Sequence, residues 1–221
     1  MPVTDQNYLD VFMQPLRVCR AYKPKFGNSE DDTSERLLRL VIKDALSLSD
    51  EDVCWSFEVP KDDGTTGTLK LDARIPLASI QNPEAQRRVR EWLTACTTHL
   101  SLSRKSTETL DGAVFEIRQG YKSADSKRQN ADLRFAARAL GTNFLPVMML
   151  VSSQVNFAVR RRYHSSNLLV LIGSLAGDPT TSTFAFYRDV VGYDLGGFFE
   201  RHSEEFRKEV QGILGSLLSP D

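Results

Sequence analysis

Two patterns of apolar residues alternate along the chain and predict an α/β fold. Apolar residues at every second position or in short continuous runs indicate strands, whereas a spacing of three or four positions indicates amphipathic helices. Strand patterns occupy residues 53–59, 68–77, 113–122, 144–152 and 168–175. Helical patterns occupy residues 33–45, 83–99, 126–140, 155–163 and 194–218, and residues 1–21 fit a short helix or arm. We therefore expect one domain, residues 1–221, with a mixed five-stranded sheet flanked by helices on both faces.

Two of the predicted strands each place one carboxylate among apolar residues. Asp72 lies between Leu71 and Ala73, and Glu116 lies between Phe115 and Ile117. Because alternate residues of a strand point to opposite faces, both acids are expected on polar strand faces. If the strands are neighbours, their oxygens form a compact site for a hard divalent ion such as Mg²⁺, which can activate water for phosphodiester hydrolysis. The alternative is that both acids are solvated and paired with nearby cations.

The charge distribution adds a candidate surface for a polyanion. The formal net charge is −1, yet residues 117–164 carry nine Lys and Arg against two acids, a local charge of +7 against −8 elsewhere. Such a localised basic surface suits DNA, although solvated helix faces give the same pattern. Arginine and amide side chains can bind guanine and adenine edges, and clustered arginines can bind phosphate. The candidate DNA-binding residues are Lys127, Arg128, Gln129, Asn130, Arg134, Arg160, Arg161 and Arg162.

Other motifs narrow the choice of function. Three cysteines without CxxC spacing argue against a disulfide framework and a zinc ribbon. The sequence has no GxxxxGK loop and no GxGxxG after a strand, so no nucleotide cofactor is expected. The N-terminal residues lack the pattern of a signal peptide, and the apolar runs are too short to span a bilayer, which favours a cytoplasmic protein without a membrane partner.

The acids and the basic segment after them resemble the PD-(D/E)xK nucleases, and among these the small type II restriction endonucleases. Asp72 matches the first acid of the family motif, and Glu116 matches the second. The lysine position holds Arg118, which stays protonated and can stabilise charge or orient water but cannot act as a general base. Lys122, or Lys127 at the next helix start, is a candidate for a migrated lysine, and Lys122 is preferred. The resemblance covers residues 53–153 in element order but few positions in motif.

The resemblance implies a magnesium-dependent enzyme that cuts double-stranded DNA as a homodimer in a restriction-modification system. Asp72, Glu116, Arg118 and Lys122 are then the catalytic candidates, and Asp72 and Glu116 bind the metal. Some members of that family also use acids from an early helix, for which Glu35 is the candidate, with Glu58 as a second. Two alternatives stay open: a non-catalytic DNA-binding protein that keeps the nuclease fold, suggested by Arg118, and a defence nuclease of low sequence specificity.

Overall fold

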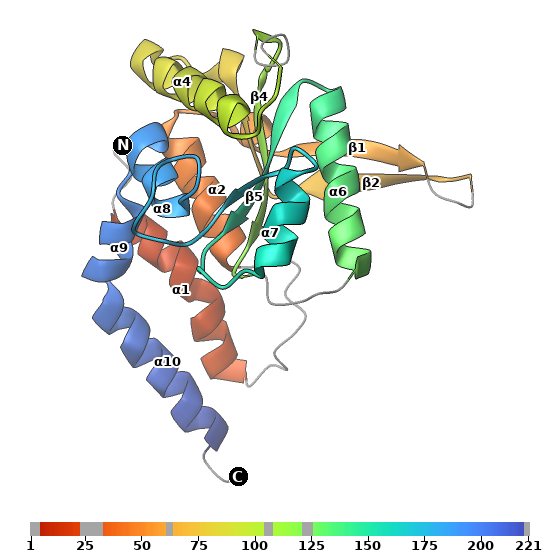
Figure 1. Cartoon of the computed structure of the whole chain (residues 1–221). Coiled ribbons are helices and arrows are strands. Elements are labelled where there is room, and N and C mark those ends of the chain that lie inside the picture. The colour runs from red at the N-terminus through yellow and green to blue at the C-terminus, as the bar shows by residue number, and fades with distance from the viewer. Residues whose placement is uncertain (1–4, 23–32, 61–63, 104–107, 121–125, 219–221) are drawn as a thin grey trace.

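A mixed four-stranded sheet forms the centre of the protein (Figure 1). The structure is a computed structural model that describes residues 5–22, 33–60, 64–103, 108–120 and 126–218. Strand β4 pairs antiparallel with β3 and parallel with β5, and β5 pairs parallel with β6. In spatial order the strands are β3 (Ala73–Pro76), β4 (Gly112–Arg118), β5 (Phe144–Leu150) and β6 (Leu169–Leu171).

The prediction of a single five-stranded sheet was wrong, because the strand expected at residues 68–77 is bent at Asp72. Its first half, β2 (Thr66–Leu71), pairs only with β1 (Trp55–Pro60) in an antiparallel hairpin, with Trp55 opposite Leu71. Its second half is β3, whose Ala73 lies opposite Phe115 of the main sheet. The hairpin projects past the side of the sheet in Figure 1.

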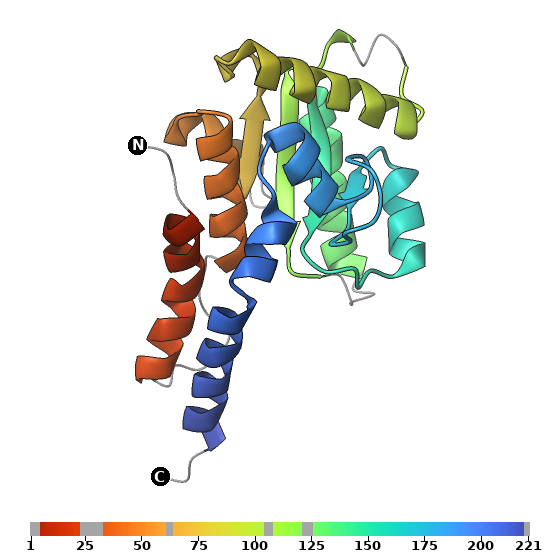
Figure 2. The same ribbon diagram turned by 90° about the vertical axis from the view of Figure 1, so that its left-hand side faces the viewer.

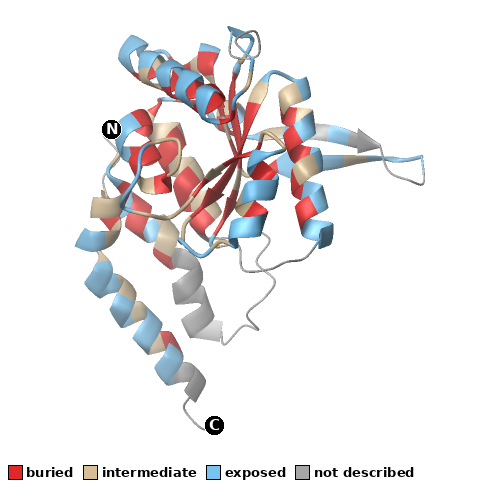
Figure 3. Cartoon of the chain, in the orientation of Figure 1, coloured by how far each residue is buried: buried red, intermediate tan, exposed pale blue. Residues whose placement is uncertain are grey.

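Helices cover both faces of the sheet, as predicted. One face packs against α2 (Thr33–Ala45) and α4 (Pro83–His99), and the other packs against α6 (Ser126–Gly141) and α7 (Phe157–His164). Because β4 and β5 are the two inner strands, nearly every residue of both is buried, and Figure 3 shows the sheet enclosed between partly exposed helices.

The helix bounds follow the sequence patterns closely where the apolar stripe is long. Asn82 caps α4 by accepting from two backbone amides, and proline follows as the first helical residue, so this helix starts where its sequence predicts. The helical pattern expected at residues 194–218 is divided between two helices, α9 (Leu195–Arg201) and α10 (Ser203–Leu218). No helix of the described ranges is both long and apolar enough to cross a membrane. The remaining elements are α1 (Asp5–Tyr22), α3 (Asp50–Val53), η1 (Leu77–Ser79), α8 (Thr183–Phe186) and the π-turn η2 (Tyr187–Val191).

The two ends of the chain pack together beside the sheet. Helix α1, longer than the expected arm, lies along α10 (Figure 2). The Asp5 carboxylate joins them to the α9 region by accepting from Arg201 at 2.6 Å and from the Tyr193 hydroxyl at 2.7 Å. These contacts extend the helical layer on the sheet face that α2 covers. The other face is covered by α6 and α7.

Candidate active site

Strand β4 places Glu116 and Arg118 on the face that α6 covers. Phe115 and Ile117 point into the core on the opposite face, so the predicted alternation is confirmed. This polar face is not open to solvent, because Val114 on the same side is fully buried and Arg118 is only 8% exposed. Helix α6 converts this part of the strand surface into a covered pocket.

That pocket has a volume of about 220 Å³ and lies between β4 and α6. Glu116 and Arg118 form its strand side, and Asp132, Arg134 and Arg138 line it from the helix. It therefore combines a carboxylate that is partly accessible with arginines able to contact an anionic group.

Asp72 reaches the same strand from the bend between β2 and β3. Its carboxylate accepts a hydrogen bond from the Ile117 amide at 2.7 Å, and its carbonyl oxygen accepts from Arg39 Nη1 at 2.8 Å. Leu71 and Ala73 belong to apolar clusters on opposite faces of the sheet, so the chain changes face at Asp72 and the expected strict alternation of residues 69–77 does not hold. The bend places the Asp72 carboxylate at the Ile117 amide of β4, a position that a regular strand would not give it.

The environment of Asp72 couples it to Glu116. Burial and, to a smaller extent, the negative charge of Glu116 raise the pKa of Asp72 to about 7, against opposing effects of the Ile117 amide and Arg39. The two predicted acids are thus within electrostatic range of each other. A cation between them would relieve this repulsion.

Arg118 is held by a buried acid that was not among the sequence candidates. Its guanidinium donates to both carboxylate oxygens of Asp132, at 3.0 and 2.5 Å, and to Glu116 at 3.1 Å. Asp132 is 3% exposed and also accepts from the hydroxyl of buried Tyr163. Although burial by itself lowers the pKa of Arg118, the hydrogen bonds and charge of Asp132 raise it above its ordinary value. The arginine is therefore a fixed cation shared between two carboxylates.

A sequence signal for Asp132 exists but is indirect. Asp132 lies on the apolar stripe of α6, three residues before Phe135 and four before Ala136, and all three are buried. An acid on a buried stripe requires a cationic or hydrogen-bonding partner. The sequence does not identify that partner, because Arg118 lies on another element.

The amides proposed to contact bases are already engaged in the structure. Arg162 donates to Gln129 Oε1 and to Asn130 Oδ1, each at 2.7 Å, and Gln129 is only 7% exposed. These contacts join α7 to α6. They occupy Gln129 Oε1 and hold the Arg162 side chain between the two helices, and base contact by Gln129 stays a prediction. The candidates that are exposed on α6 are Lys127, Arg128, Asn130 and Arg134.

The two secondary acids differ in position. Glu35 lies in the first turn of α2, four residues before Arg39, and so on the same side of that helix as the residue bound to the Asp72 carbonyl. Glu58 is exposed on β1. It lies opposite Thr68, a residue of β2 that precedes Asp72 by four positions. Glu58 is thus not brought to the site, since the hairpin extends away from it. Lys122 lies outside the described residues.

Magnesium fits the acids that are present, because Asp72 and Glu116 are electrostatically coupled. Within the described ranges, no group of three or more His, Cys, Asp or Glu residues is placed to hold a metal ion. Magnesium commonly binds through one or two carboxylates and keeps several water ligands, so Asp72 and Glu116 form an adequate donor pair.

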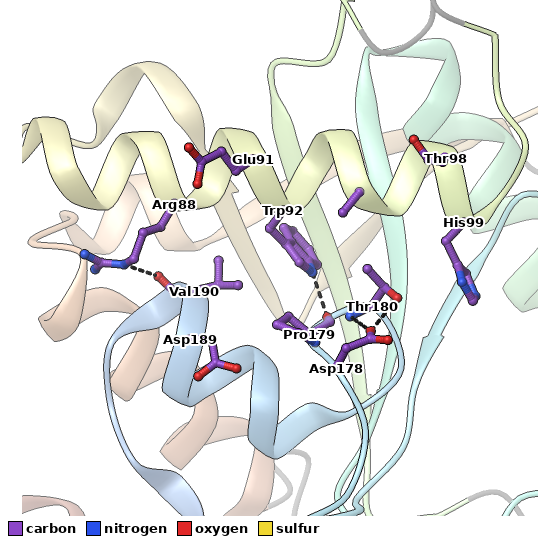
Figure 4. A pocket seen from close by; sticks show the side chains of 11 residues that line it. Arg88, Glu91, Trp92, Thr98, His99, Asp178, Pro179, Thr180, Asp189 and Val190 are labelled. Atoms are coloured by element: carbon purple, nitrogen blue, oxygen red, sulfur yellow. Dashed lines mark hydrogen bonds between the residues drawn. The ribbon is translucent and has the colours of Figure 1, made fainter.

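A second hollow, on the opposite face, is lined by charged groups of both signs, Arg88, Glu91, Asp178 and Asp189. It lies between α4 on one side and residues 178–180 and η2 on the other, and it has a volume of about 630 Å³ (Figure 4). Trp92 Nε1 donates to the Pro179 carbonyl at 2.8 Å, and Arg88 Nε donates to the Val190 carbonyl at 3.2 Å. These bonds fix α4 to the C-terminal segment and give the hollow a structural explanation.

Comparison with known proteins adds no assignment. No protein-family model matches the chain, and neither the curated proteins nor the solved structures that were searched contain a match.

Proposed function

We propose that the protein is a magnesium-dependent endonuclease that hydrolyses phosphodiester bonds of double-stranded DNA, of the sequence-specific type II restriction kind. The observation that carries the proposal is the hydrogen bond from the Ile117 amide to the Asp72 carboxylate. It joins the first acid to the middle of the sequence Glu116-Ile117-Arg118, although the two segments are 45 residues apart in the chain.

In this proposal Asp72 and Glu116 hold the metal ion, and Glu35 is a further candidate from α2. Bound magnesium supplies Lewis-acid chemistry, lowering the pKa of a water and polarising a phosphoryl oxygen. Arg118 orients the Glu116 carboxylate through its 3.1 Å hydrogen bond. Because Arg118 is also paired with Asp132, its single positive charge does not neutralise both Asp72 and Glu116.

Phosphate binding would come from arginines at the pocket and on the helices beside it. Arg134 and Arg138 line the pocket that contains Glu116, one helical turn apart on α6. Lys127 and Arg128 extend the cationic surface toward the start of that helix. Lys122 remains the candidate for the lysine of the family motif, because Arg118 is committed to Asp132.

The homodimer belongs to the same proposal. A two-fold assembly with one site per subunit would cut both strands of a palindromic sequence. Sedimentation of the protein with a DNA duplex that contains the cleaved sequence tests this, with two subunits per duplex as the expected result.

A non-catalytic DNA-binding protein is the second candidate, and the burial of Arg118 favours it. A motif cation that is bidentate to an internal acid is suited to stabilising the fold rather than to contacting a reacting phosphate. This alternative predicts salt-sensitive DNA binding without strand cleavage.

Cleavage of long DNA of known sequence decides between these functions. We expect discrete fragments with magnesium, none with EDTA, and rates lower by orders of magnitude in Asp72→Asn and Glu116→Gln, with DNA binding retained. Glu91→Gln, which changes an exposed glutamate on α4, is the matched control and should cut at the wild-type rate. Intact DNA across salt and pH would overturn the nuclease in favour of the binding protein, and a smear of fragments would indicate a nuclease of low specificity.

A further inference from the structure

Helix α7 has a cationic and aromatic face that the proposed active site does not use. Phe157, Arg160, Arg161 and His164 are spaced by three or four residues, which places them on one side of a helix with 3.6 residues per turn. Phe157 is 77% exposed, an unusual state for a large apolar side chain.

The other side of α7 makes the internal contacts of the helix. Val159 and Tyr163 are buried against the sheet and α6, and Arg162 binds the α6 amides. The side of Phe157 therefore points away from α6 and from the pocket that contains Glu116. Any ligand on it would be bound separately from the reacting phosphate.

A pocket of about 410 Å³ lies along this face, between α7, the end of α4 and the edge strand β6. This volume is within the range of about 300–1,000 Å³ typical of small-ligand sites. Its polar lining includes Arg160, Arg161, His164 and His99, whereas Leu100 and Leu168 contribute apolar surface. Among the residues that the structure describes, no carboxylate lines it. It is therefore suited to an anion that also carries an apolar part.

The end of α4 is fixed against α7 at this pocket. His164 Nε2 lies 3.1 Å from the His99 carbonyl oxygen, and the two imidazole rings meet edge to face with centroids 5.4 Å apart. Figure 4 shows His99 at the last turn of α4, where its side chain also lines the hollow beside Trp92. The pocket is thus bounded by two helices in direct contact rather than by a single exposed surface.

The residue types indicate the ligand. Guanidinium groups bind phosphate oxygens with paired hydrogen bonds, and an exposed aromatic ring stacks on a nucleobase that has left its own stack. We propose that this pocket holds one unstacked nucleotide of a DNA strand, with its phosphate on Arg160 and Arg161 and its base against Phe157. The inference rests on the proposed function only for DNA as the source of the nucleotide.

Binding of a fluorescein-labelled single-stranded oligothymidylate in EDTA tests the pocket without requiring cleavage. Phe157→Ala and the double variant Arg160→Ala/Arg161→Ala should each weaken binding by about five-fold or more, the lower limit expected for loss of one base-stacking contact. The matched control Arg90→Ala/Arg207→Ala removes two exposed arginines from other helices and should change affinity little. Wild-type affinity in Phe157→Ala, or an equal loss in the control, would overturn the proposal.

Calorimetry with thymidine monophosphate and with inorganic phosphate identifies the source of the ligand. We expect the oligothymidylate to bind more tightly than the monophosphate, and the monophosphate more tightly than phosphate. Equal binding of monophosphate and oligothymidylate would overturn DNA as the source, and equal binding of phosphate and monophosphate would overturn the role of the base. If the protein cleaves duplex DNA but does not bind single strands, the nucleotide pocket is refuted and the proposed nuclease stands. If it binds single strands but does not cleave duplex DNA, only the proposed nuclease is refuted.

Discussion

Replacing Asp72 by asparagine should stabilise the metal-free protein at alkaline pH. Burial and Glu116 raise the pKa of this carboxyl from 3.8 to about 7 in the folded state. A folded-state pKa above the unfolded value means that the ionised form is disfavoured by folding, so stability is lost as the pH rises from about 4 through 7. Asparagine carries no charge and its side-chain oxygen can still accept from the Ile117 amide.

The size of the effect follows from the pKa difference. Each unit is about 1.36 kcal/mol, so the shift of Asp72 sets an upper limit of roughly 4 kcal/mol at pH 8. Asp72 is only partly buried, and solvent screening reduces such values, so a gain of about 1–2 kcal/mol is the expected result. Below about pH 4 the gain should vanish, because the wild-type carboxyl is then protonated in both states.

Urea denaturation in EDTA at pH 4, 6 and 8 measures this gain, and magnesium then tests the shared metal site. At ten times its dissociation constant, magnesium should stabilise the wild type by about 1.4 kcal/mol and should stabilise Asp72→Asn far less. Asp10→Asn, an exposed change on α1, is the control and should alter neither the pH profile nor the magnesium response.

Two results would refute this reasoning. A loss of stability in Asp72→Asn that is equal at pH 4 and pH 8 would show that the carboxylate acts through packing rather than charge. An undiminished magnesium response in the variant would place the ion elsewhere and remove the shared site of Asp72 and Glu116.

Three further outcomes can be measured with the same methods. Asp132→Ala should cost about 3–5 kcal/mol in urea denaturation, because it leaves Arg118 buried without its main counter-ion. Lys122→Ala should lower the cleavage rate without loss of stability if Lys122 serves the reaction. Arg118→Ala should lower both the cleavage rate and the stability, and a stable but inactive Arg118→Ala would contradict a structural role for Arg118. Gly112→Ala should lower the melting temperature strongly, since its φ is +153° and a Cβ would lie 2.0 Å from a backbone oxygen of β3. Gly141→Ala, with nothing within 4 Å, is the control and should be nearly neutral.

The sequence alone determined the long helices and the faces of β4. Long apolar stripes predicted α4 and α6, since amphipathic periodicity and caps are local properties of the chain. The alternation around Glu116 correctly assigned Phe115 and Ile117 to the core. The short helix α8 and the π-turn after it were not predicted, because a turn of four or five residues is too short to show a period.

Only the tertiary structure decided where the acids lie and which groups they contact. The bend at Asp72 divides one predicted strand between two sheets, and strand pattern alone cannot reveal a change of face between Leu71 and Ala73. The pairing of Arg118 with Asp132 depends on the packing of α6 against β4, which residue types do not specify. Local periodicity therefore predicted which residues are buried, whereas the partners of the buried charges depended on contacts between segments distant in the chain.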